Sequence, residues 1–197
     1  MKTLFTFFLM SFSFAFSQKT LAADFQLTSS DLQAEQAIPD NFYGNRFGCS
    51  NKGISPQLEW KNEPSDTGSF AVTLFDESAP TGTGFYHYVL YNIPATTHSI
   101  NTGDLSSIPA KLPKGAIEST NDGGNPSYFG PCPPDGPHNY IFTVFALKKA
   151  DLGITPFTNN IPASGLLVST PAFVRFNMWA QGILGQASFK VTASPRK

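Results

Sequence analysis

The chain has 197 residues, of which 41% are hydrophobic and 14% are charged, and its formal net charge is −1 at pH 7. A chain of this size can bury one sizeable core. No run of basic residues occurs, which argues against nucleic-acid binding, because that function needs a positive patch to displace counterions. The same balance argues against broad electrostatic adhesion to anionic membranes.

Residues 1–23 are predicted to be a secretory signal peptide. Lys2 supplies a positive charge, residues 4–16 form a short apolar run, and small residues follow at Ser17 and at Ala22 and Ala23. Cleavage is expected after Ala23, with a cut after Ser17 or a buried N-terminal helix as alternatives. The run is too short to span a bilayer, so no transmembrane anchor is expected. Residues 24–197 should form a single domain that is periplasmic or secreted.

The rest of the chain is predicted to be mainly β. Short runs rich in Val, Phe, Tyr, Thr and Ile lie between turns rich in Gly and Pro, which is typical of strands. These runs are residues 25–28, 58–60, 69–76, 86–93, 140–147 and 187–192. The runs 86–93 and 140–147 are nearly apolar throughout, so we expect them to lie centrally and to be buried on both faces.

One segment near the C-terminus is predicted to be a helix. Ser169 or Thr170 can cap it, Pro171 suits its first turn, and Gly182 is a plausible stop. Apolar residues recur between them at helical spacing, namely Phe173, Phe176 and Ala180. The connection 96–128 is long and rich in Ser, Gly, Pro and Asn, and loops of that length in a compact domain are often functional.

Two of the three histidines and one carboxylate fall at or near the ends of predicted strands. Asp76 ends one strand, His87 lies in the next, and His138 opens a third, just after the Pro-rich turn 130–134. A carboxylate can accept the N–H of an imidazole and orient the ring. Together these residues could form a small polar pocket for a phosphate, a carboxylate or a zwitterionic head group. The alternative is that each histidine is a satisfied core residue, and His98 is expected in an exposed loop.

The chain has two cysteines, Cys49 and Cys132. In an exported chain an even pair favours a disulfide. Two free buried thiols are the alternative. Neither cysteine lies in a CxxC redox motif.

Four segments occur in an order that is more specific than any one of them. Residues 49–60 contain Ser-Pro followed by Leu and Trp at alternating positions, residues 69–80 form a strand ending in D-E-S-A-P, His87 precedes the segment 91–95, and residues 130–140 contain G-P-C-P-P and H-N-Y. In this order they resemble the phosphatidylethanolamine-binding protein family, in its bacterial, Raf-kinase-inhibitor-like (YbhB/YbcL-type) branch. The resemblance covers about residue 25 to the C-terminus. It implies a β-sandwich-like domain around a central antiparallel sheet, with a few short peripheral helices, including one near the C-terminus.

The resemblance also implies a ligand pocket and no catalytic residue, metal or cofactor. In this family the pocket binds small anions and phosphorylated head groups, and here its lining would be Asp76, His87, Pro133, His138 and Tyr140. The implied function is a non-enzymatic binding protein whose partner is a small anionic or phosphorylated ligand. His87 and His138 would donate hydrogen bonds to the anion, and Asp76 would orient one of them. Segment 52–56 would pack near the site and bring Cys49 towards Cys132.

The chain departs from the family pattern at four positions. Ser78 stands where the family has a second aspartate and Glu77 where it has a proline, while Asn139 replaces a common arginine and Tyr86 a frequent tryptophan. The loss of a carboxylate at Ser78 predicts a less negative pocket, and the set predicts an altered ligand preference.

Two other functions are alternatives. One is a regulatory inhibitor of a protease or kinase, with a protein partner that binds surface loops, especially 96–128. The other is a hydrolase or an enzyme with a metal held by both histidines and Asp76, since two imidazoles and a carboxylate can bind zinc. Against an enzyme, the sequence contains no GxSxG elbow, HExxH motif or activated-cysteine motif.

Overall fold

The computed structural model describes residues 24–46, 48–154 and 170–196, so the predicted signal peptide lies outside the described residues. The described chain forms two antiparallel sheets. The smaller sheet has the order β1-β2-β5 and consists of β1 (Gln26–Thr28), β2 (Leu58–Lys61) and β5 (Ser99–Ile100). The larger has the order β6-β4-β3-β7-β8 and consists of β6 (Ile117–Glu118), β4 (Phe85–Pro94), β3 (Ser69–Asp76), β7 (His138–Leu147) and β8 (Ile183–Ala193).

All six predicted strands are present, and the mainly β class with a central antiparallel sheet is confirmed. β3 has the predicted bounds, whereas β8 begins four residues before the predicted run. β5 and β6 lie within the connection 96–128 and were not predicted, because a strand of two residues carries no periodic pattern. A short 3-10 helix, η1 (Asp40–Phe42), precedes the loop that contains Cys49.

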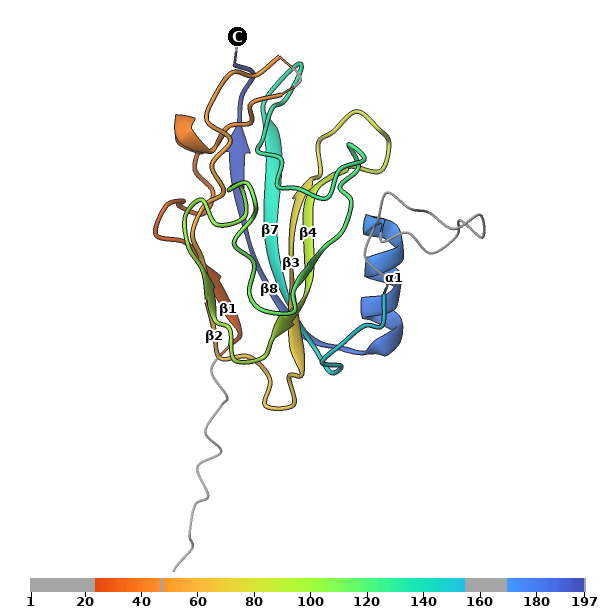
Figure 1. The fold of residues 1–197 in the computed structure, drawn as a ribbon. Helices are drawn as coiled ribbons and strands as arrows, with labels where there is room; N and C mark the ends of the chain where they lie inside the picture. The colour runs from red at the N-terminus through yellow and green to blue at the C-terminus, as the bar shows by residue number, and fades with distance from the viewer. Residues whose placement is uncertain (1–23, 47, 155–169, 197) are drawn as a thin grey trace, which may run out of the picture.

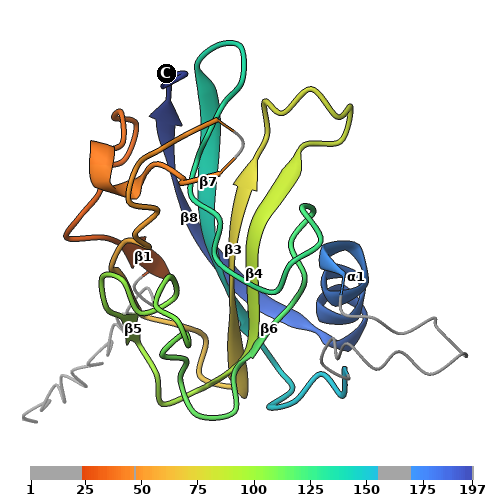
Figure 2. The same cartoon turned by 45° about the horizontal axis from the view of Figure 1, so that its top comes forward.

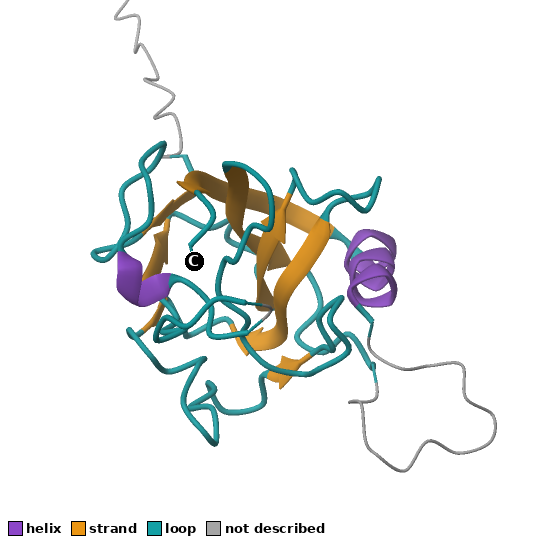
Figure 3. Ribbon diagram, turned by 90° about the horizontal axis from the view of Figure 1, so that it is seen from above, coloured by secondary structure: helices purple, strands orange, loops and turns teal. Residues whose placement is uncertain are grey.

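The larger sheet is the middle layer of the domain, with the smaller sheet on one face and the helix α1 (Pro171–Gln181) on the other (Figures 1 and 3). Side chains of β3 alternate between these faces: Phe70 and Val72 join the cluster on the side of the smaller sheet, whereas Ala71 joins the cluster that contains Val174 of α1. Burial on both faces explains why the runs in β3, β4 and β7 are apolar almost throughout.

The helix α1 has the predicted ends, and of the apolar residues at the predicted spacing Phe173 packs against the core whereas Phe176 does not. The Thr170 hydroxyl accepts a hydrogen bond from the amide of Phe173 at 3.3 Å, and Gly182 ends the helix with a φ of 103°, which favours glycine. The buried residues are Pro171, Val174 and Met178. Phe176, at the predicted spacing, is 60% exposed. Among the described residues no helix is long and apolar enough to cross a membrane.

Candidate functional site

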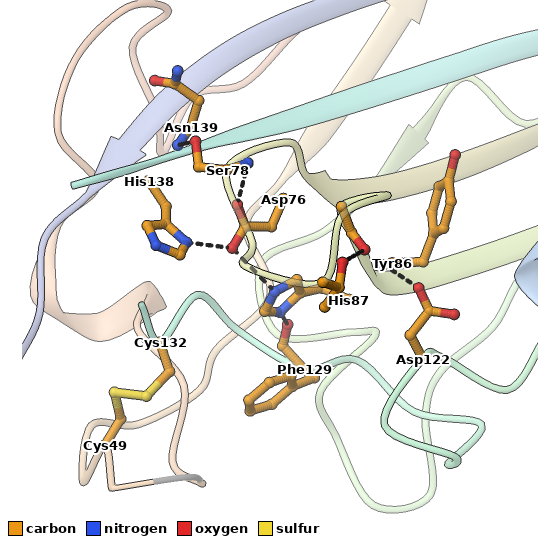
Figure 4. Close-up of polar contacts among 12 residues, drawn as sticks. Cys49, Asp76, Ser78, Tyr86, His87, Asp122, Phe129, Cys132, His138 and Asn139 are labelled. Carbon is orange, nitrogen blue, oxygen red and sulfur yellow. Dashed lines mark hydrogen bonds and ion pairs between the residues drawn. A yellow bond between two sulfur atoms is a disulfide. The ribbon is translucent and has the colours of Figure 1, made fainter. Parts of the chain in front are cut away.

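The polar cluster lies where β3 ends and β7 begins, beneath the loops at one end of the larger sheet (Figures 2 and 4). Asp76 pairs in register with Tyr140, and His138 lies two residues earlier on β7. Because residues two apart on a strand share a face, all three side chains point to the side of the smaller sheet. Asp76 is 3% exposed, His138 4% and Tyr140 0%, so the cluster is buried.

His87 reaches this cluster through a β-bulge. Between β3 and β4 the register shifts, so that Leu74 pairs with Tyr88 but Phe75 pairs with Tyr86, and His87 is the extra residue. Strict alternation along β4 would place the His87 side chain on the face opposite Tyr88. The bulge instead turns this side chain towards Asp76. The His87 Nε2 atom lies 4.0 Å from Asp76 Oδ2. The structure therefore brings all three predicted polar side chains of β3, β4 and β7 together.

The Asp76 carboxylate is the centre of the hydrogen-bond network. Its Oδ2 atom lies 2.7 Å from His138 Nδ1, and its Oδ1 accepts from the amide of Ser78 at 2.9 Å (Figure 4). The Ser78 hydroxyl in turn accepts from the amide of Asn139 at 3.0 Å. Ser78, the residue that stands in place of the family's second aspartate, thus joins the end of β3 to the start of β7, and Asp76 is held by backbone as well as by imidazole.

His138 is in contact with a carboxylate at each ring nitrogen. Besides Asp76 at Nδ1, Oδ1 of Asp135 lies 3.0 Å from Nε2. An ionised carboxylate only accepts hydrogen bonds, so both nitrogens must carry a hydrogen and the ring is an imidazolium. Burial by itself would lower the pKa of His138, but the hydrogen bonds to Asp76 and Asp135, with their charges, outweigh it and raise the pKa.

The protonation state of His87 is the opposite of that of His138. Its Nδ1 atom lies 3.0 Å from the carbonyl oxygen of Phe129, which can only accept, so Nδ1 carries the hydrogen. Burial lowers the pKa of His87 to about 4, against the opposing charge of Asp76. At neutral pH the ring is therefore neutral and its Nε2 is an acceptor. This differs from the expectation that both histidines donate to an anion.

Aromatic rings enclose the cluster. The Phe129 ring stacks on His87 with centroids 4.9 Å apart, and the Tyr140 ring meets His87 edge-on at 5.2 Å. Burial first, and then the negative charge of Asp76, raise the pKa of Tyr140, so its phenol stays neutral. The Tyr140 hydroxyl is buried beside Asp76 without a hydrogen bond of good geometry, and it is a potential donor to a ligand.

The turn 130–137 forms the wall of the site next to β7. The predicted disulfide between Cys49 and Cys132 is present and joins this turn to the loop after η1 (Figure 4). The amide of Gly44 also donates to the carbonyl of Pro131 at 2.8 Å. A Cβ on Gly130 would lie 2.7 Å from the backbone oxygen of Phe42, so the two segments approach too closely for any other residue there. Pro133 is buried in the same turn.

The other sequence candidates lie apart from this cluster. His98 faces Glu63 at 2.8 Å, and its side chain is 47% exposed, as expected for a loop histidine. Within residues 24–46, 48–154 and 170–196, no three His, Cys, Asp or Glu side chains are grouped so that they could hold a metal ion.

The opposite states of the two histidines predict how stability depends on pH. The folded-state pKa of His87, about 4, lies below its ordinary value of 6.5, so the unfolded chain takes up a proton first as the pH falls. The neutral, buried His87 therefore contributes about 3 kcal/mol to the free energy of unfolding above pH 6.5. This stabilisation is lost as the pH falls through 4. The raised pKa of His138 acts in the opposite sense, since its contribution is complete below 6.5 and is lost as the pH rises through the raised value.

We expect the free energy of unfolding, measured with urea between pH 4 and 8, to decline on the acid side in the unmodified protein and to decline less in His87→Gln. His98→Gln is the matched control, because it removes an exposed histidine and should leave the acid decline in place. If the free energy of unfolding declined equally with pH in the unmodified protein and in His87→Gln, the buried His87 would not be the cause of the loss of stability at acid pH.

Comparisons with known proteins agree with this architecture. A family model described as phosphatidylethanolamine-binding protein matches residues 28–192. The chain is 40% identical over 149 residues to the UPF0098 protein YbcL of Escherichia coli (strain K12), covering 75% of this chain and 79% of that protein. It is 41% identical over 123 residues to the UPF0098 protein YbhB of the same organism, covering 62% of this chain and 77% of that protein.

Solved structures resemble the chain over most of its length. The crystal structure of E. coli YbcL, described as a new member of the mammalian PEBP family, superposes with a TM-score of 0.74 at 34% identity, over 89% of this chain and 100% of that one. The crystal structure of CT736, a PEBP homolog from Chlamydia trachomatis, gives a TM-score of 0.65 at 23% identity, over 85% of this chain and 95% of that one. The second likeness concerns the fold alone.

Proposed function

The chain belongs to the phosphatidylethanolamine-binding protein family, and from that premise we propose that it is a non-enzymatic binding protein that holds a small anionic or phosphorylated group at the cluster of Asp76, His87 and His138. Tyr140 and the buried Pro133 would complete the lining. The ligand would be a free anion or the head group of a larger molecule.

One observation carries this proposal, namely the buried ion pair of His138 and Asp76. Asp76 fixes the imidazolium through Nδ1 at 2.7 Å, which directs Nε2, the nitrogen that contacts the exposed Asp135, outward as a positively charged donor at the end of the sheet. A donor of this kind contributes roughly 1.5–3 kcal/mol to the binding of an anionic oxygen. Because the pair is assembled before the ligand arrives, little ordering is required on binding.

The state of His87 narrows the class of ligand. With its hydrogen on Nδ1, the His87 ring offers an acceptor at Nε2, while the donor of His138 is the Nε2 that contacts Asp135. A ligand that carries both a negative oxygen and a proton of its own would satisfy both rings. Hydrogen phosphate and monoprotonated phosphate monoesters have this pattern. A few such bonds, offset by desolvation, correspond to an affinity on the order of millimolar to micromolar for a bare anion.

Export is the second part of the proposal. The leader-like residues 1–23 favour a periplasmic or secreted location. The disulfide between Cys49 and Cys132 supports it, since disulfides persist in oxidising compartments.

The alternatives have less support. The pairing of Cys49 with Cys132 leaves neither thiol as a nucleophile. Within the loop 96–128, Ile108 is a wholly exposed large apolar residue, and a single exposed residue of this kind is normal on a protein surface. The buried ion pair is therefore stronger support for a ligand pocket than the loop is for a protein-binding surface.

Replacing His138 with glutamine tests the pocket. We expect calorimetric titration with phosphate and with O-phosphorylethanolamine to show saturable binding to the unmodified protein, weakened at least about tenfold in His138→Gln because a charge-assisted bond is lost. Binding to the unmodified protein should also weaken as the pH rises through the raised pKa of His138.

His98→Gln is again the matched control and should bind as the unmodified protein does. Equal affinity in folded His138→Gln would contradict the proposal, and so would the absence of saturable binding to any variant.

A further inference from the structure

The Nε2 atom of His138 is already engaged by a carboxylate of this chain. Oδ1 of Asp135 lies 3.0 Å from it, and the hydrogen bond to His138 is the main cause that lowers the pKa of Asp135. The Asp135 carboxylate is thus in the position relative to the imidazolium that an anionic oxygen of a ligand would take. Its side chain is 68% exposed, whereas the side chain of His138 is 5% exposed.

Charge makes this contact incompatible with a second anion. The groups that face His138 are Asp76 and Asp135 on opposite sides of its ring, the neutral His87, and the neutral Tyr140. The cluster therefore contains two carboxylates and one imidazolium, and its net charge is negative while Asp135 stays in contact with His138. A further anion would meet repulsion and would find no free donor on His138.

The chain around Asp135 allows the side chain to leave. Cys132 is tied to Cys49, and His138 is fixed as the first residue of β7, so the intervening residues 133–137 form a short span anchored at both ends. Asp135 and Pro137 are exposed within it, and a Cβ built on Gly136 would meet nothing within 4 Å. A rotation of the Asp135 side chain or of this exposed tip would uncover Nε2 without moving Asp76 or His138.

We propose that Asp135 is a built-in substitute for the ligand: its carboxylate occupies the anion position on His138, and a small anion or phosphorylated group binds by displacing it. This inference rests on the proposed function. It makes Asp135 a residue that sets the affinity of the pocket and favours ligands with more acceptor oxygens and more negative charge than a carboxylate. Such a ligand keeps the bond to Nε2 and can form others, whereas a simple carboxylate only repeats what Asp135 already provides.

Asp135→Ala, with Glu77→Gln as the matched control, tests the inference. Glu77 is an exposed carboxylate at the end of β3, so both changes remove one negative charge near the site, but only the first removes the contact with His138. The readouts are the affinity for phosphate and for acetate at pH 7 by calorimetry, and the pKa of the His138 ring by NMR. In Asp135→Ala we expect phosphate to bind at least about tenfold more tightly and the pKa of free His138 to fall. In Glu77→Gln both should change little.

Three results would decide against the inference, and they separate it from the proposed function. If Asp135→Ala binds phosphate no more tightly than the unmodified protein, which itself binds, the pocket stands and the displacement is wrong. If Glu77→Gln gains as much affinity as Asp135→Ala, the gain comes from general charge and not from the vacated donor. If neither variant nor the unmodified protein binds phosphate, while NMR shows the His138 pKa falling in Asp135→Ala, both the anion site and the displacement are overturned.

Discussion

Replacing Asp76 with asparagine is expected to lower the free energy of unfolding by about 3 kcal/mol, because removing one partner of a buried ion pair leaves the other charge without compensation. Asp76 is 3% exposed and lies 2.7 Å from the His138 ring. An asparagine oxygen can still accept from the amide of Ser78, so the turn after β3 should persist. The loss therefore reports on the charge and not on a broken backbone.

The same change should weaken phosphate binding at least about tenfold and lower the pKa of His138, since the imidazolium loses its fixed carboxylate. Urea unfolding at pH 6 and NMR titration of the ring measure the two effects. Glu77→Gln removes a neighbouring exposed carboxylate and should stay within about 0.5 kcal/mol of the unmodified protein. Asp76→Asn with unchanged stability would mean that the buried pair is no more favourable than a neutral contact.

The double variant Asp76→Asn/His138→Gln sharpens this result. With both charged groups replaced by neutral ones that can still form hydrogen bonds, no buried charge is left unpaired. The double variant should therefore be more stable than the sum of the two single losses implies, with a coupling of about 1–3 kcal/mol. Additive losses would show that Asp76 and His138 act independently, against their 2.7 Å contact.

The strands could be predicted from the sequence because each central run is buried on both faces and carries a continuous apolar signal. β3, with seven of its eight residues buried, was placed with its observed bounds. β5 and β6 have only two residues each and owe their positions to the neighbours β2 and β4, which no local pattern records. The buried side of α1 was likewise undetermined, since Val174 and Met178, four residues apart, fit a helical face as well as Phe173 and Phe176, three residues apart, do.

The site could be predicted only in part. Asp76 and His138 end and begin adjacent strands, so their proximity follows from antiparallel pairing once the strands are known. The position of His87 does not follow from strand pairing, because alternation from the buried Tyr88 would place its side chain on the other face of the sheet. Its position depends on a bulge that the sequence does not mark.

The protonation states of the two histidines were not visible in the sequence either. His87 is neutral because of its burial and the carbonyl of Phe129, and His138 is charged because carboxylates lie at both nitrogens. The hydrogen bond from His87 to the backbone oxygen of Phe129 could not be predicted from residue types, because every residue has a backbone carbonyl. The sequence gives a weak indication of the contact with Asp135, which is a carboxylate three residues before a histidine in a turn rich in Gly and Pro. Only the three-dimensional structure shows that its side chain turns towards the ring.

Removing the disulfide should have the largest effect on stability and a small effect on binding. Cys49 and Cys132 are 83 residues apart, and in the chain-entropy model closing a loop of this length stabilises the folded state by about 4.5 kcal/mol, because it restricts the unfolded chain. We therefore expect the double variant Cys49→Ala/Cys132→Ala to lose about that much free energy of unfolding. Urea unfolding of the oxidised protein and of the variant measures the difference.

Phosphate affinity of the folded variant should stay within about twofold of the unmodified protein, because the disulfide is not the only link between the two segments of the wall. The hydrogen bond from Gly44 to Pro131 and the close approach of Gly130 to Phe42 do not involve sulfur. Gly130→Ala supplies the converse test, since its Cβ would meet the Phe42 oxygen at 2.7 Å while the disulfide is kept, and this variant should lose affinity. If binding were lost in the cysteine variant and kept in Gly130→Ala, the disulfide, and not the glycine contact, would hold the turn 130–137 against the ion pair.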